Sequence, residues 1–305
     1  MPAPIVTLTA AELHALRTSR IAIPVRDAVF RVEGPGTFSC LQGLVTNDVS
    51  KLADRTAAWG AFLSPKGMIV SDAWVVRDGD AAWVIVPYEA HETMSQLFGR
   101  TMPPRLAKVA DQSITMAVHW LAGGVIGGID DAAIIRPERQ APFAAMLLTP
   151  NAAATDALLI EQGWSIAPAS HADALKVVFG WPTLRREIDD KTLPQEVRFD
   201  ELGGVKYDKG CYTGQETVAR LHFRGHANRA LRAVQWPASE SSASGSVTVG
   251  EKIIGTLNTV VQFGDQCIAL AKLRREATPG ESVRVGDADG VIVELPLDLG
   301  ALSVA

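Results

Sequence analysis

The chain has 305 residues, of which 47% are hydrophobic and 21% charged, and its formal net charge is −5 at neutral pH. This composition is that of a globular protein of two or three domains and excludes global disorder, a collagen-like repeat and a coiled coil. The negative charge also excludes a basic field over the whole molecule, so any surface that binds anions must be local.

The N-terminal half alternates helix and strand signals. Thr9 and Glu12 have the spacing of a capping box, which predicts a helix directly after Thr9. The pattern then predicts a strand over 28–32, a short helix near Phe38, strands over 59–63, 68–77 and 81–86, a helix over 88–98 and a strand over 114–120. The glycines of 123–128 fit no phosphate-binding spacing and predict turns between strands.

The second half begins with two helices and ends in short strands. Helices over 150–162 and 170–179 are each followed by a glycine, Gly163 or Gly180, at a plausible helix end. Short alternating runs then predict strands over 231–236, 247–256, 260–263, 267–273, 283–285 and 291–295, a pattern typical of a small barrel. The serine-rich stretch 237–246 is typical of a linker or a long loop. Because no regular βαβ rhythm is present, the elements favour an α+β fold.

The cysteines and the apolar runs predict the cellular compartment of the protein. Cys40, Cys211 and Cys267 are odd in number and widely spaced, so neither a disulfide framework nor a zinc site is expected. Free thiols are typical of a reducing compartment. Residues 1–4 lack the features of a signal peptide, and no apolar run reaches the length of a membrane span. We therefore expect a cytoplasmic protein with no membrane partner.

Residues 206–220 carry the strongest chemical signal. Thr213 and Glu216 have capping-box spacing, which predicts a helix that starts at Thr213 and a loop that holds Cys211 just before it. The positive end of that helix, with Lys209 nearby, would favour the Cys211 thiolate. Tyr207 and Tyr212 could stack on a flat heterocycle. The alternative is that Cys211 is a small buried hydrophobe and that Tyr212 packs in the core.

Charge gathers in the same region. Residues 206–232 hold six Lys and Arg side chains and two acids, a net charge of +4 in an acidic chain. A basic island beside a helix start favours an anionic small molecule or an RNA backbone as its ligand. The alternative is a solvated helix face whose Arg side chains cover apolar surface.

Several blocks resemble one family. Residues 209–216, Lys-Gly-Cys-Tyr-Thr-Gly-Gln-Glu, resemble the K-G-C-Y-x-G-Q-E signature of the YgfZ family, folate-binding proteins related to the glycine cleavage T-protein and to the mitochondrial iron–sulfur assembly factor. Further elements of the family resemble residues 38–49, 60–67, 193–196, and 255–257 followed by 269–275. Two positions depart from the related patterns: Lys176 stands where an Arg is common, and of two acids in the T-protein relatives only Asp72 remains.

The resemblance implies an architecture. It is an α+β, T-protein-like ring of two ferredoxin-like subdomains plus a small C-terminal β-barrel. The implied domains are residues 1–50 with 150–230, an inserted subdomain over 51–149, and a barrel over 231–305. In that arrangement 237–246 is a loop inside the barrel.

The resemblance also implies a function, a folate-binding accessory factor for the assembly or repair of iron–sulfur proteins. Cys211 is then the functional thiol, assisted by Lys209. Tetrahydrofolate or another reduced folate would bind in the central cleft, with implied contacts from Glu196, Tyr212, Gln215, Arg220 and Lys176. The partners would be the folate and iron–sulfur proteins or their assembly machinery, and tight nucleic-acid binding and a resident metal are not expected.

Two alternatives stay open. The first is a tetrahydrofolate-dependent aminomethyltransferase or demethylase-type C1-transfer enzyme, in which Asp72 is the catalytic carboxylate. The second is a plain binding protein in which Cys211 is structural.

Overall fold

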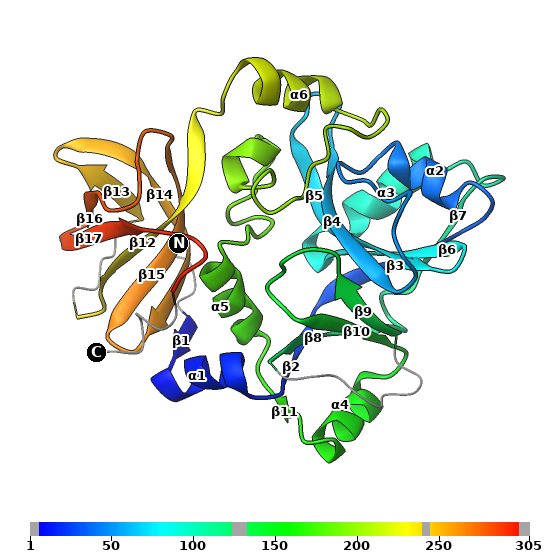
Figure 1. The fold of residues 1–305 in the computed structure, drawn as a ribbon, viewed down its shortest axis with the longest axis horizontal. Helices are drawn as coiled ribbons and strands as arrows, with labels where there is room; N and C mark the ends of the chain where they lie inside the picture. The colour runs from blue at the N-terminus through cyan, green and yellow to red at the C-terminus, as the bar shows by residue number, and fades with distance from the viewer. Residues whose placement is uncertain (1–5, 124–132, 240–244, 299–305) are drawn as a thin grey trace.

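The computed structural model describes residues 6–123, 133–239 and 245–298. A small barrel and a large sheet stand side by side, and one helix, α5, lies between them (Figure 1). The helical elements are α1 (Ala10–Thr18), α2 (Thr37–Gln42), η1 (Tyr88–Ala90), α3 (His91–Thr101), α4 (Ala152–Glu161), α5 (Ser170–Phe179), η2 (Pro194–Val197) and α6 (Gln215–Arg224).

The large sheet has ten strands in the order β11-β2-β8-β10-β9-β4-β5-β6-β3-β7. Their bounds are β2 (Ile21–Val25), β3 (Asp27–Glu33), β4 (Thr56–Leu63), β5 (Ile69–Asp78), β6 (Ala81–Pro87), β7 (Lys108–Asp111), β8 (Ala117–Ala122), β9 (Ala133–Pro137), β10 (Ala145–Thr149) and β11 (Ser165–Ile166). The strands β4 and β5 alternate between two cores. One face packs Phe62 and Val75 with Phe98 of α3, and the other turns Trp59 and Trp74 toward α5.

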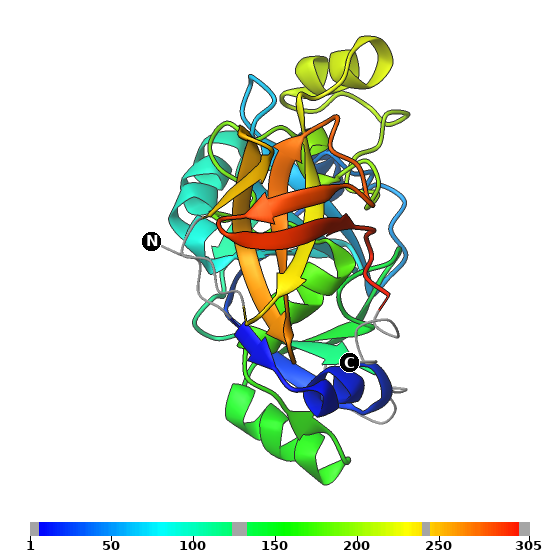
Figure 2. The ribbon, with the colours of Figure 1, turned by 90° about the vertical axis from the view of Figure 1, so that its left-hand side faces the viewer.

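The barrel closes on itself. Its strands pair in the ring β14-β13-β16-β17-β12-β15, and an additional β14–β15 pairing completes the circle, while β1 pairs in parallel with β14. The bounds are β1 (Val6–Leu8), β12 (Arg229–Pro237), β13 (Ser246–Val249), β14 (Lys252–Phe263), β15 (Gln266–Arg274), β16 (Ser282–Val285) and β17 (Ala288–Val293). Figure 2 faces the barrel. The expected α+β fold with a small C-terminal barrel is therefore confirmed.

Most local signals are confirmed. The amide of Glu12 donates to the hydroxyl of Thr9 and the amide of Thr9 donates to the Glu12 carboxylate, which makes the predicted capping box. Gly163 and Gly180 have φ of 81° and 65°, the left-handed conformation expected after α4 and α5. Within the described residues, no helix is long and apolar enough to cross a membrane.

The strands after residue 246 begin and end at other residues than predicted. The run 247–256 is not one strand, because Gly250 takes φ of 56° and turns the chain between β13 and β14. The strand β14 then continues unbroken to Phe263, with a bulge that absorbs the irregular register. The predicted turns within 123–128 and the serine-rich loop over 237–246 fall largely outside the described residues.

Candidate functional site

Three tryptophans form the wall of a cavity. Trp59 on β4 and Trp74 on β5 are cross-strand partners, and Trp181 follows α5. The ring of Trp181 lies 4.4 Å from that of Trp59 and is stacked 5.7 Å from that of Trp74. The cavity has a volume of about 320 Å³, which is within the range of small-molecule sites. The three indole rings are almost fully buried, and Trp59 also stacks on Phe199 at 4.0 Å, so they form a rigid apolar base for the cavity.

The mouth of this tryptophan cavity carries charge. Glu138, Arg139 and Lys206 line it. Burial raises the pKa of Glu138, although Lys206 and Arg139 counteract the shift. Arg139 lies against Gly203, where a Cβ would be 2.6 Å from the arginine Cδ, so only glycine leaves room for this side chain. Two cations against one carboxyl make the mouth suitable for an anionic group.

A second cavity of about 570 Å³ shares Arg139 and Gln140 with the first. It is mostly apolar and is lined by Phe143, Leu175 and Phe179 among others. Arg139 therefore stands between two cavities. A ligand with an aromatic head and an anionic tail would have both kinds of surface within its reach.

A buried carboxyl group, Asp72, interacts with the half-buried side chains of Asp27 and Lys176 close to the tryptophans. Trp59 Nε1 donates to Asp72 Oδ2 at 3.2 Å, while Asp72 Oδ1 is buried and has no partner among the described residues. Burial raises the pKa of Asp72, and Lys176 counteracts it. Burial also raises the pKa of Asp27 to about 7, and the Asp72 charge adds to that rise while Lys176 opposes it. A carboxyl that titrates near neutrality can accept or donate a proton.

A third cavity has another carboxyl group, Glu89, in its lining. Glu89, whose charge helps to raise the pKa of Asp27 and Asp72, lines a cavity of about 520 Å³ with an apolar floor that includes Ile69 and Ile188. Asp72 thus accepts a hydrogen bond from a residue that lines the tryptophan cavity and interacts electrostatically with a residue that lines the third cavity.

The predicted role of Lys209 is corrected by its contacts. Its ammonium donates to three backbone carbonyl oxygens, those of Gln42, Val45 and Asn47, at 2.7–2.8 Å. Burial lowers the pKa of Lys209 to about 8, so the group is still charged at neutral pH. All three of its protons are used. Lys209 therefore ties the 42–47 loop to the Cys211 segment, and its charge is committed to those carbonyls rather than to a thiolate.

The predicted capping box at Thr213 is wrong. The helix α6 starts at Gln215 after Gly214, which has φ of 80°, and no side chain caps it. Gly214 approaches the backbone of Ser64 so closely that a Cβ would lie 2.5 Å from the Ser64 carbonyl oxygen. This long-range contact fixes a left-handed residue where the pattern placed a helical one. Cys211 is exposed and lies four residues before α6, outside the first turn of the helix.

The tyrosines are occupied by protein contacts. Tyr207 stacks on His222 at 3.6 Å and donates a hydrogen bond to Asp200. Tyr212 is buried, with its pKa raised to about 12 by burial, and Lys209 lies 5.1 Å from its ring centre. The structure places Tyr212 in the core, as the alternative interpretation expected.

The other predicted ligand residues fall into two groups. Glu196 Oε2 accepts from the Leu193 amide and Gln215 Oε1 accepts from the Tyr212 amide, so each holds local backbone. Arg220 is exposed on α6. Lys176 and Asp72 lie together in the buried carboxyl cluster, whereas Cys211, Lys209 and Gln215 share the loop before α6. The prediction missed Asp27, Arg139 and the tryptophan wall, which come from segments far apart in the sequence.

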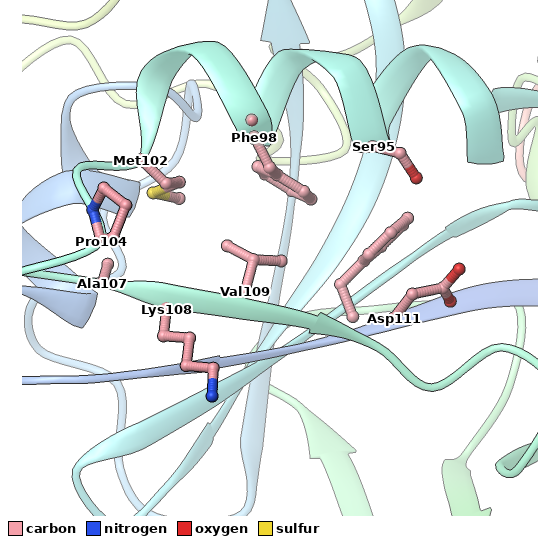
Figure 3. Close-up of a pocket in the computed structure, with 10 residues that line it drawn as sticks. Ser95, Phe98, Met102, Pro104, Ala107, Lys108, Val109 and Asp111 are labelled. Carbon is pink, nitrogen blue, oxygen red and sulfur yellow. The ribbon is translucent and has the colours of Figure 1, made fainter.

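A further pocket between α3 and β7 has a volume of about 300 Å³ (Figure 3). Phe98 and Val109 meet across it, and Ser95 and Asp111 lie at one end. The carboxylate of Asp111 already accepts from Ser113 and is paired with His91 at 2.6 Å. Because its acid is satisfied, this pocket is a weaker candidate than the tryptophan cavity.

Known proteins share both sequence and fold with this chain. The GCVT N-terminal domain family matches residues 3–124. The "tRNA-modifying protein YgfZ" of Klebsiella pneumoniae (strain 342) is 27% identical over 295 residues, which cover 88% of this chain and 90% of that protein. The protein of the same name from Escherichia coli O157:H7 is 26% identical over 311 residues, with 88% and 90% covered.

A solved structure has a fold similar to that of this chain. The glycine cleavage system aminomethyltransferase T from Bartonella henselae superimposes with a TM-score of 0.78 at 15% identity, and the match covers 94% of this chain and 88% of that one. At this identity the likeness shows a common fold. The chain is therefore a homologue of the YgfZ proteins, and it shares the fold of the glycine cleavage T-protein.

Proposed function

We propose that this protein is a folate-binding accessory factor that supports the assembly or repair of iron–sulfur proteins, with Cys211 as its functional thiol. The observation that carries the folate part is the tryptophan cavity with cations at its mouth. A reduced folate is a flat heterocycle joined to a carboxylate-bearing tail, so its two ends match the wall and the mouth.

Individual residues fit such a ligand. Trp59, Trp74 and Trp181 would hold the ring, and Arg139 and Lys206 would pair with the carboxylates. Asp72 Oδ1 and Trp120 Nε1 are buried polar atoms without a partner among the described residues, and buried polar groups are normally hydrogen-bonded. They are a free acceptor and a free donor beside Lys176. Tetrahydrofolate, when bound, supplies a carrier for one-carbon units.

The thiol part of the proposal rests on how Cys211 is presented. The side chain is exposed, and the segment before it is held by the three hydrogen bonds of Lys209. A fixed loop that offers one thiol to solvent suits transient contact with a sulfur atom or cluster of a client protein. The relatives are named tRNA-modifying proteins, which makes tRNA modification a process that this factor would support.

A second candidate, C1 transfer, is favoured by one observation. Burial raises the pKa of Asp72, and its carboxyl group accepts a hydrogen bond from Trp59, which lines the tryptophan cavity. An acid with a raised pKa beside the proposed folate site could take up or release a proton in such a reaction. Asp27 and Lys176 would set the charge of that acid.

Calorimetric titration with tetrahydrofolate tests the folate site. Arg139→Ala should weaken binding by about 10-fold or more, since a hydrogen bond between two charged groups contributes about 1.5–3 kcal/mol. Arg136→Ala is the matched control, because Arg136 is an exposed arginine on β9 just before the cavity mouth. Absence of heat at millimolar ligand would remove the folate proposal.

Two further measurements separate the candidate functions. Cys211→Ser should fail to restore iron–sulfur enzyme activity in a deletion strain while it retains tetrahydrofolate binding. Consumption of a methylated amine by the purified protein with tetrahydrofolate, lost in Asp72→Asn, would favour C1 transfer instead.

A further inference from the structure

The outward face of α6 combines exposed cations with an exposed aromatic ring. Arg220, Phe223 and Arg224 lie on this face, and Arg229 follows five residues after the helix ends. Figures 1 and 2 both show α6 at the top of the molecule, projecting from the body. Phe223 is 67% exposed, which is unusual for so large an apolar side chain. We call these four residues the α6 surface.

The cations of the α6 surface are unpaired. Within the described part of the chain, the side chains of Arg220, Arg224 and Arg229 form no hydrogen bond or ion pair. The one acid on the same helical stripe is Glu216, which also has no ion-pair partner there. Elsewhere the chain is acidic, so three unpaired guanidinium groups in ten residues form a local site for anions.

The aromatic ring of this surface is held in place from below. Phe223 meets the ring of His222 edge to face at 4.8 Å, and His222 stacks on Tyr207. Tyr207 in turn is fixed by its hydrogen bonds with Asp200 and Gln195. The network orients Phe223 although water surrounds most of its ring. Packing of the protein core does not explain such an arrangement.

We infer that the α6 surface binds single-stranded nucleic acid, with a base stacked on Phe223 and neighbouring phosphates paired with the arginines. Stacking on an aromatic ring between cations is how sequence-tolerant single-strand sites work. A base in a double helix is already stacked on its neighbours, so a duplex has no free base face that could stack on Phe223. An acidic peptide would pair with the arginines but leave the ring in water. This surface is separate from the tryptophan cavity that we propose for the folate, so the two proposals can fail independently.

The charge of the whole chain limits this binding. Only about three phosphates can be neutralised, so the affinity should be modest and the slope of log affinity against log salt should be about −2. Binding would be measurable at low ionic strength and weak at physiological salt. This agrees with the expectation that tight nucleic-acid binding is absent.

Fluorescence anisotropy with a labelled single-stranded RNA of about 12 nucleotides tests the inference at low salt. Phe223→Ala should weaken binding about 5- to 100-fold, and the pair Arg220→Ala with Arg224→Ala should weaken it and reduce the salt slope. Arg105→Ala, which removes an exposed arginine between α3 and β7, is the control and should leave binding within twofold. Thermal unfolding should be unchanged in all variants because these side chains are exposed.

Three outcomes would overturn the inference. Binding unaffected by Phe223→Ala, with equal competition by polyglutamate, would identify the surface as a site for an acidic protein. Equal affinity for a duplex of the same length would show that no base is stacked. Absence of binding at low salt would leave the α6 surface without a nucleic-acid role.

Discussion

The indole nitrogen of Trp59 donates its hydrogen bond to Oδ2 of Asp72, a carboxyl group that is only 8% exposed. The side chain of Trp59 thus lines the tryptophan cavity and also donates a hydrogen bond to the buried acid. Movement of the Trp59 ring on ligand binding would change the environment of Asp72 directly. Because Asp72 also faces Asp27 and Lys176, such a change would extend to the charge balance of the whole cluster.

Asp27 should make the stability of the protein depend on pH. Its pKa is about 7 in the folded state against 3.8 in a free side chain, so the folded chain holds this proton more tightly. The free energy of unfolding should therefore fall between about pH 4 and pH 7 through this group, and stay level above. Asp27→Asn should remove that fall and stabilise the protein at pH 8 by on the order of 1–3 kcal/mol.

Urea unfolding of wild type and Asp27→Asn across this pH range is the measurement. The difference between the two proteins isolates Asp27 from other titrating groups. A difference that stays constant with pH would mean that Asp27 has an ordinary pKa in the folded state.

Replacement of Lys209 should destabilise the protein rather than merely inactivate it. Lys209→Met leaves the carbonyls of Gln42, Val45 and Asn47 without their donor and should cost about 3 kcal/mol or more in unfolding free energy. Lys209→Arg should rescue little, because a planar guanidinium cannot direct its donors to three points as an ammonium does. Denaturant unfolding measures this. Native stability combined with loss of function would instead give Lys209 a chemical role.

Glu196 can be tested for ligand contact without loss of its structural bond. Its Oε2 accepts from the Leu193 amide, and Glu196→Gln keeps an oxygen for that bond while it removes the charge. If Glu196 binds the ring of the folate, the Gln variant should lose about 1.5–3 kcal/mol of binding free energy by calorimetry. Glu196→Ala serves as the comparison, since it loses both the charge and the local cap. Wild-type affinity in the Gln variant would restrict Glu196 to capping η2.

The three cysteines should react in the order of their exposure. Cys211 is exposed, Cys40 is half-buried, and Cys267 is buried with its pKa raised by that burial. Limiting iodoacetamide followed by mass spectrometry should label Cys211 first and Cys267 last. Faster labelling of Cys40 than of Cys211 would show that the loop before α6 shields its thiol.

Local signals in the sequence predicted local structure well. The capping box at Thr9 forms because both partners lie within one turn, and Gly180 ends α5 because only its own backbone must adopt φ of 65°. The same capping pattern at Thr213 fails because the turn at Ser64, far away in the sequence, forces Gly214 into a left-handed conformation. A capping rule contains no information about such a neighbour.

The same contrast between local and long-range contacts applies to the candidate site. The signature segment 209–216 was found because its residues are consecutive. The cavity was missed because Trp59, Trp74 and Trp181 are brought together only by strand register and by the position of α5. Likewise, Lys209 lies two residues before Cys211 in the sequence, but its hydrogen bonds are donated to carbonyl groups more than 160 residues earlier.

The parallel pairing of β1 with β14 has a consequence for biosynthesis. Val6 and Leu8 find their partners at Val261 and Phe263, so β1 cannot pair until the chain has been synthesised beyond Phe263. Until then Leu8, which is fully buried in the finished protein, lacks the part of its core that β14 supplies. The strand β1 is thus among the last to join the fold. A chain released before β14 would keep the apolar residues of β1 exposed, where quality-control proteases could recognise them.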